Sequence, residues 1–95
     1  MLLKDLTQAF GVSGYESEVR EIIKESVKDY ADDVIVDALG NLIAYKKGSS
    51  KNKKTIMAAA HMDEIGLQIT KIDDNGSIKV KTLGFLWADT TYMSR

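Results

Sequence analysis

The 95 residues include 44% hydrophobic and 28% charged side chains, a composition typical of a soluble globular domain and unlike that of a disordered chain. Thirteen basic and fourteen acidic side chains leave a net charge of −1, which excludes a general attraction to nucleic acid or to an anionic membrane surface. Cysteine is absent and no apolar run reaches membrane-spanning length, so we expect a cytoplasmic protein without disulfides or a transmembrane segment.

The first third of the chain is predicted to be helical. Apolar residues at helical spacing indicate a short helix from Leu2 to Phe10. A second and longer helix is predicted from Tyr15 to Tyr30, because apolar residues line one of its faces. These apolar residues are Val19, Ile22, Ile23, Val27 and Tyr30. Ser13 stands three residues before Glu16, and this spacing predicts a capping box at the start of the second helix.

The next segment changes to the pattern of short strands. Val34–Val36 and Leu42–Tyr45 are predicted to be strands, and Leu39–Asn41 supplies the turn between them. The run "KKGSSKNKK" then carries five lysines in nine residues. Because no aromatic residue is interleaved for base stacking, we interpret this run as a solvated loop and not as a nucleic-acid-binding segment.

A strand buried on both faces is predicted at Thr55–Ala60, which has no polar residue after its first position. The long helix is expected to pack against this strand. A hairpin follows, in which Leu67–Ile72 and Ser77–Thr82 are joined by a type I′ turn at Asn75–Gly76. Together these elements predict an α/β fold. Apolar residues typical of a core follow the hairpin: Phe85, Leu86, Trp87, Tyr92 and Met93.

The only histidine of the chain, His61, lies in the string "AHMDE" at the end of the predicted central strand. Asp63 is two residues later and would lie on the same side of that strand, at the carboxyl end where open α/β sheets place ligands. A histidine that binds a metal needs an acceptor on its second ring nitrogen, and Asp63 is well placed to be that acceptor. From the spacing alone, a surface or strand-end ion pair is the more common interpretation of such a pair. One histidine and one aspartate also cannot complete a site, because a catalytic zinc normally has three protein ligands.

Three stretches of the sequence resemble the dinuclear-metal aminopeptidases of the glutamyl, deblocking and tetrahedral-assembly type, some of which are labelled endoglucanases. These stretches are "AFGVSGYESEVREII", "DALGNLIAYKKG" and "AHMDEIGLQITKIDDNGSIKV". The resemblance implies that His61 binds one of two divalent ions, zinc or cobalt, and that Asp63 is the catalytic-site carboxylate that orients the histidine. It also implies a peptide substrate and a homo-oligomer.

The same resemblance implies the domain organisation. Residues 1–67 would open a zinc-peptidase domain with a mixed sheet, and residues 68–95 would begin an inserted β-rich domain. Complete members of the family are several times longer, and their bridging aspartate, general-base glutamate and other metal ligands follow later in the chain. We therefore expect a metal-dependent aminopeptidase in origin, with at most one weak metal ligand and no activity in these 95 residues alone.

Two functions of other classes remain open. The first is a non-catalytic folded fragment that assembles with another chain through exposed strands and the region of Trp87, because uncovered strand edges tend to find partners. The second is a glycosidase, which needs two carboxylates about 5–5.5 Å or about 6.5–9.5 Å apart. Asp63 and Glu64 are adjacent and would point to opposite faces of a strand, so they make a poor pair.

Overall fold

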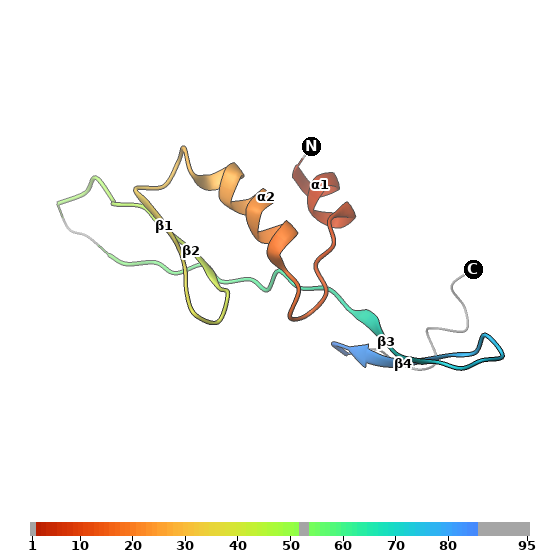
Figure 1. The fold of residues 1–95 in the computed structure, drawn as a ribbon. Coiled ribbons are helices and arrows are strands. Elements are labelled where there is room, and N and C mark those ends of the chain that lie inside the picture. The colour runs from red at the N-terminus through yellow and green to blue at the C-terminus, as the bar shows by residue number, and fades with distance from the viewer. Residues whose placement is uncertain (1, 52–53, 86–95) are drawn as a thin grey trace.

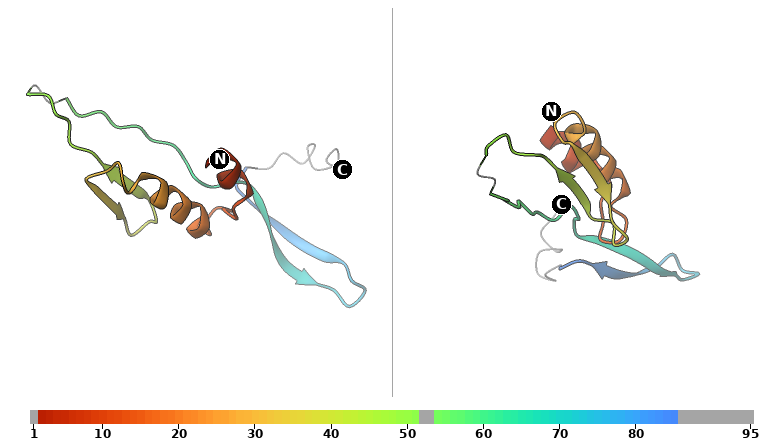
Figure 2. Two further views of the ribbon diagram at one scale, coloured as in Figure 1. Left: turned by 90° about the horizontal axis from the view of Figure 1, so that it is seen from above. Right: turned by 90° about the vertical axis from the view of Figure 1, so that its left-hand side faces the viewer.

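A computed structural model describes residues 2–51 and 54–85 and shows two helices followed by two antiparallel hairpins (Figure 1). The elements are α1 (Leu2–Gln8), α2 (Ser17–Val27), β1 (Asp33–Val36), β2 (Leu42–Tyr45), β3 (Gly66–Ile72) and β4 (Ile78–Leu83). The overall dimensions are 67 × 25 × 24 Å. Figure 2 shows two reasons for this length: the β3–β4 hairpin leads away from the helices at one end, and the loop after β2 extends beyond the first hairpin at the other.

The helices and the first hairpin form a small packed unit. Helix α2 contacts α1 on one side and β2 on the other, so its apolar face is shared between these two elements. The buried apolar side chains of the described residues are Ala9, Val12 and Val19, which are 5–9% exposed. Both predicted helices are present. Helix α1 ends two residues before its predicted end, and α2 is shorter than predicted at both ends. No helix of the described part is long and apolar enough to cross a membrane.

The predicted capping box at α2 is wrong. Glu16 occupies the N-cap position, and no side chain caps the helix. The Glu16 carboxylate instead accepts a hydrogen bond from the backbone N–H of Gly14 at 2.6 Å. The hydroxyl of Ser13 donates to the carboxylate of Asp63. Hydrogen bonds to ionised acceptors are stronger than neutral ones, so the hydroxyl is directed to the carboxylate, and it accepts no hydrogen bond from the start of the helix.

The two hairpin turns are built in the same way. In the first, the backbone N–H of Gly40 donates to the carbonyl of Asp37 at 3.0 Å; in the second, Gly76 donates to Asp73 at 2.9 Å. Both glycines have a positive φ, 87° and 85°. The predicted type I′ turn would also need a positive φ at Asn75, and no described non-glycine residue has one. Each hairpin therefore uses a turn that ends in a single left-handed glycine.

The β3–β4 hairpin has one apolar face and one basic face. Its register shifts between Ile69 and Lys71, and on either side of the shift Ile69 pairs with Val80 and Ile72 pairs with Ile78. Opposed residues share a face, so the shift brings Ile69 and Ile72 to the same side although they are three residues apart. The apolar face consists of Leu67, Ile69, Ile72, Ile78 and Val80, which are 49–64% exposed. The other face carries Gln68, Lys71, Lys79 and Lys81.

The predicted central strand at Thr55–Ala60 is wrong. This segment is extended and exposed, with Ile56 89% and Met57 86% exposed, and it is part of neither sheet (Figure 1). A strand exists only through hydrogen bonds to a neighbouring strand, and no strand of the described residues pairs with this segment. The expected packing of α2 against it is also absent from the described part. Phe85 is exposed, and the other predicted core residues lie outside the described residues: Leu86, Trp87, Tyr92 and Met93.

The loop before α2 crosses the segment before β3, and this crossing joins the two halves of the molecule. Val12 and Glu64 form a parallel bridge, and the backbone N–H of Glu64 donates to the carbonyl of Gly11 at 2.8 Å. Val12 packs directly over Gly66, where an added Cβ would lie 2.6 Å from Val12 Cγ2. Only a residue without a side chain fits at position 66 while Val12 stays in place.

Replacing Gly66 with alanine should therefore destabilise the fold by about 1–3 kcal/mol, the usual cost of forcing an extra methyl group into a packed contact. Denaturant unfolding followed by circular dichroism measures this loss. The matched control is Gly48→Ala, because no described atom lies within 4 Å of the Cβ that it would add. Equal stability of the two variants would contradict the close contact between Val12 and Gly66.

The turn at Asp37 should respond to pH. The side chain and backbone N–H groups of Asn41, and then the backbone N–H of Leu39, donate to Asp37 and hold the pKa of its carboxyl below the usual range. Because this pKa is lower in the folded than in the unfolded state, the carboxylate stabilises the fold above the unfolded pKa, about 3.9. That stabilisation is lost as the pH falls through the folded pKa.

Asn41→Ala should raise the pKa of Asp37 and reduce the loss of stability at acid pH. A carbon-13 NMR titration of the Asp37 carboxyl checks the first effect, and thermal unfolding at a series of pH values checks the second. Asn75→Ala, which removes an asparagine side chain from the turn of the second hairpin, should leave the titration of Asp37 unchanged. A carboxyl that titrates identically with and without Asn41 would refute this account of the turn.

Candidate functional site

His61 and Asp63 lie together just before β3, as the spacing in the sequence predicts. The Nδ1 atom of His61 is 3.0 Å from Asp63 Oδ1 and 3.1 Å from the backbone oxygen of Asp63. Both contacts of Nδ1 are to acceptor oxygens, so in the neutral ring the proton belongs on Nδ1 and the lone pair of Nε2 is available. The His61 side chain is 85% exposed and the Asp63 side chain 36% exposed. The imidazole is thus held on one side and open on the other.

Asp63 is the most connected side chain of the site. Its Oδ2 accepts a hydrogen bond from the hydroxyl of Ser13, and its Oδ1 faces His61. These two partners, first Ser13 and then His61, hold the pKa of the Asp63 carboxyl below its usual range. The carboxylate is therefore ionised at neutral pH, and both of its oxygens have a donor.

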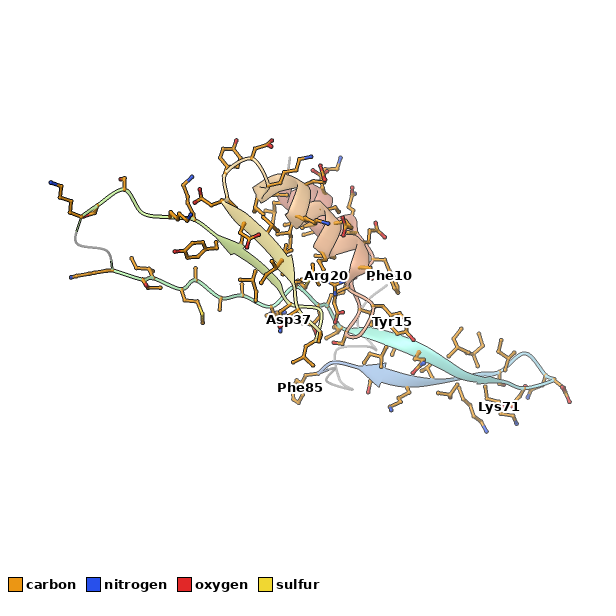
Figure 3. The ribbon with its side chains drawn as sticks, turned by 60° about the vertical axis from the view of Figure 1, so that its left-hand side comes forward. Phe10, Tyr15, Arg20, Asp37, Lys71 and Phe85 are labelled. Carbon is orange, nitrogen blue, oxygen red and sulfur yellow. The ribbon has the colours of Figure 1, made fainter. Side chains whose placement is uncertain are left out.

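Helix α2 is tied to the first hairpin beside this pair. Arg20 lies between α2 and the β1–β2 hairpin (Figure 3). Its Nε donates to the carbonyl of Gly40 at 2.7 Å, and its Nη2 lies 3.8 Å from Glu16 Oε2. Arg20 therefore fixes the turn of the β1–β2 hairpin against the first turn of α2. This places Glu16, Gly40 and Asn41 along one side of the site.

Two cavities meet at His61 and Asp63. One has a volume of about 240 Å³ and extends toward the core between α1 and α2, where Ala9 and Val19 line it. The other has a volume of about 160 Å³ and lies toward the β1–β2 turn, where Leu39 lines it. The imidazole thus stands between an apolar cavity and a more polar one.

The open Nε2 of His61 is a nitrogen that could bind a metal ion. Within residues 2–51 and 54–85, no group of three or more histidine, cysteine or acidic side chains is arranged to hold a metal ion. His61 and Asp63 together fit one ligand position of a metal site. The Nε2 atom of His61 is open, and its Nδ1 atom is hydrogen-bonded to the carboxylate of Asp63. Further ligands would have to come from outside the described residues.

Ser13 is the site residue that sequence reasoning missed. It lies 50 residues from Asp63 in the chain, and its local pattern favoured a helix cap. No spacing rule connects two residues so far apart. The proximity of Ser13 to Asp63 follows only from the three-dimensional structure, in which the Gly11–Glu64 hydrogen bond holds the two segments side by side.

Comparison with known proteins identifies the class to which this chain belongs. Residues 40–95 match the family described as M42 glutamyl aminopeptidase, and residues 1–23 match a family described as AMPT. The chain belongs to the M42 glutamyl aminopeptidase family, which confirms the resemblance noted in the sequence. The lysyl aminopeptidase of Pyrococcus furiosus is 42% identical over 90 residues, which are 94% of this chain and 25% of that protein.

Solved structures agree with this membership. The TET aminopeptidase of a marine sediment Thaumarchaeota archaeon has a TM-score of 0.81 and 41% identity, over 93% of this chain and 24% of its own. A Thermotoga maritima protein whose structure is named as an endoglucanase has a TM-score of 0.77 and 40% identity, over 88% of this chain and 27% of its own. The chain spans about a quarter of the length of the relatives it matches.

The exposed imidazole should react readily with diethyl pyrocarbonate, because His61 Nε2 is open to solvent. We expect a modification rate close to that of N-acetylhistidine, followed by ultraviolet absorbance. His61 is the only histidine of the chain, so His61→Ala should show no histidine modification and serves as the blank. A rate reduced tenfold or more would contradict the open face of the ring.

Proposed function

We propose that the chain is the N-terminal part of a metal-dependent aminopeptidase, in which His61 binds a divalent ion and Asp63 orients the imidazole. The observation that carries the proposal is the 3.0 Å contact between His61 Nδ1 and Asp63 Oδ1 on a ring whose other nitrogen is open. Membership in the M42 glutamyl aminopeptidase family supports the reaction class. The substrate class is a peptide with a free N-terminus.

The residues present fit a divalent ion as a partial ligand set. His61 Nε2 would bind the ion, and the ionised Asp63 would hold the Nδ1–H tautomer and make the imidazole a better donor. By resemblance to the family the complete site holds two ions, zinc or cobalt. A bound divalent ion supplies Lewis-acid chemistry for peptide hydrolysis. The remaining ligands and the general base belong to other parts of the complete protein.

The contacts of Asp63 favour the peptidase over a glycosidase. A glycosidase needs two carboxylates that flank the cleaved bond, one of which acts as an acid. The pKa of the Asp63 carboxyl is lowered by Ser13 and His61, so this group is a poor acid. Both of its oxygens also have partners within the protein. Asp63 is thus suited to hold a histidine and not to protonate a leaving group.

The proposed domain organisation follows the same resemblance. We place residues 1–67 in the peptidase domain and residues 68–95 at the start of an inserted β-rich domain. The direction of the β3–β4 hairpin, which leads away from the helices, supports a boundary near the start of β3 (Figure 2). A cytoplasmic homo-oligomer completes the proposal, and the exposed apolar face of this hairpin supports association with further protein.

Zinc and cobalt should bind to this chain weakly and through His61. We expect calorimetric titration to give a dissociation constant in the range of about 0.1–1 mM, since one imidazole and open coordination positions supply little affinity. His61→Ala should abolish this binding. Aminopeptidase activity should be undetectable for these 95 residues and should appear when the remaining ligands and the base are present in a longer chain.

Glu64→Gln is the matched control, because it removes an exposed charge three positions from the histidine without touching the pair. This variant should bind zinc like the wild type. Binding that survives His61→Ala, or that falls equally in Glu64→Gln, would refute the proposed role of His61.

A further inference from the structure

We propose that Ser13 is a positioning residue of the metal site: its hydroxyl holds one oxygen of Asp63 so that the other oxygen faces His61. The inference rests on the proposed function and adds a residue to it. Ser13 would touch neither metal nor substrate. It would act through Asp63, from a loop that precedes the pair by some fifty residues.

The geometry forms a chain of three side chains. Ser13 Oγ donates to Asp63 Oδ2, and His61 Nδ1 donates to Asp63 Oδ1. A carboxylate is planar and rotates broadly about its last torsion, so one hydrogen bond leaves its orientation poorly defined. A second donor on the opposite oxygen fixes the plane. Because Ser13 holds Oδ2, the remaining oxygen stays aimed at the imidazole.

Ser13 is itself held in place by backbone contacts. The Glu64 N–H donates to the Gly11 carbonyl at 2.8 Å, which anchors the loop beside Asp63. On the other side of the serine, the Tyr15 N–H donates to the Val12 carbonyl at 2.7 Å and closes a turn. Gly14 occupies that turn with φ of 88°. The hydroxyl is therefore carried on a constrained loop, and little ordering of the chain is needed to form the contact.

A purely structural role for the hydroxyl explains less. Ser13 does not cap α2, because no side chain makes a cap hydrogen bond there. The crossing of the two segments is already secured by the Gly11–Glu64 hydrogen bond and by the contact between Val12 and Gly66. These contacts do not involve the hydroxyl. What the hydroxyl adds is the orientation of the Asp63 carboxylate.

The tautomer of His61 in the metal-free protein tests this role directly. His61 is the only histidine, so nitrogen-15 NMR of the imidazole is free of overlap. At a pH where the ring is neutral, the wild type should be mainly the Nδ1–H tautomer. Ser13→Ala should shift the population toward Nε2–H, and Ser13→Thr, which keeps a hydroxyl, should restore it. Ser26→Ala is the matched control, because the Ser26 hydroxyl donates within α2 to the Ile22 carbonyl.

Zinc affinity supplies a second readout. Loss of a residue that supports a metal ligand typically weakens binding about tenfold or more, and we expect Ser13→Ala to fall in that range. An unchanged tautomer population in Ser13→Ala overturns the proposal, as does unchanged zinc affinity in a protein whose binding His61→Ala abolishes. If Ser13→Ala fails to fold, Ser13→Cys decides between the same outcomes, because it keeps the size of the side chain and weakens the donor.

Failure of the proposed function would look different. Zinc binding that is indifferent to His61→Ala refutes the metal site itself. The tautomer comparison, made without metal, still reports whether Ser13 orients the pair. The two results therefore separate an error about the metal from an error about the serine.

Discussion

The crossing of the Gly11–Gly14 loop over the segment from Met62 to Gly66 is the contact on which the rest of the molecule depends. It joins parts of the chain that are fifty residues apart, and it does so through backbone groups, a valine packed on a glycine, and the Ser13–Asp63 hydrogen bond. The few buried side chains gather close to it, since Val12 belongs to the crossing and Val19 contacts Gly11. The candidate site is assembled by the same contact, because Asp63 receives one of its two donors across it.

Local signals predicted most of the secondary structure. The two helices and both hairpins appear within a few residues of their expected positions, because their apolar periods and glycine turns act over short distances. The contact between His61 and Asp63 was also predictable, since side chains two apart in an extended segment share a side. Their roles in metal binding and catalysis stay predictions.

Long-range relations were not predictable. The apolar run from Thr55 to Ala60 has the composition of a central strand, but composition cannot supply the neighbouring strands that a strand needs. Ser13 has the local pattern of a helix cap, and only its three-dimensional neighbour shows why its hydroxyl is used elsewhere. The turn at Asn75–Gly76 departs from expectation for a smaller reason: a hairpin can satisfy its twist with one left-handed glycine, so the asparagine keeps an ordinary conformation.

Because of the register shift in β3, the number of residues in this strand determines which side chains lie on the apolar face and which on the basic face. Because side chains alternate along a strand, adding or deleting one residue on either side of the shift would exchange the isoleucines with the lysines over the remainder of the hairpin. The extra residue at the shift corrects the phase once, so any second single-residue change would undo that correction. Insertions or deletions of two residues in this strand should therefore be tolerated more easily than those of one residue. The bulge is the position at which the alternation of side chains between the two faces changes phase.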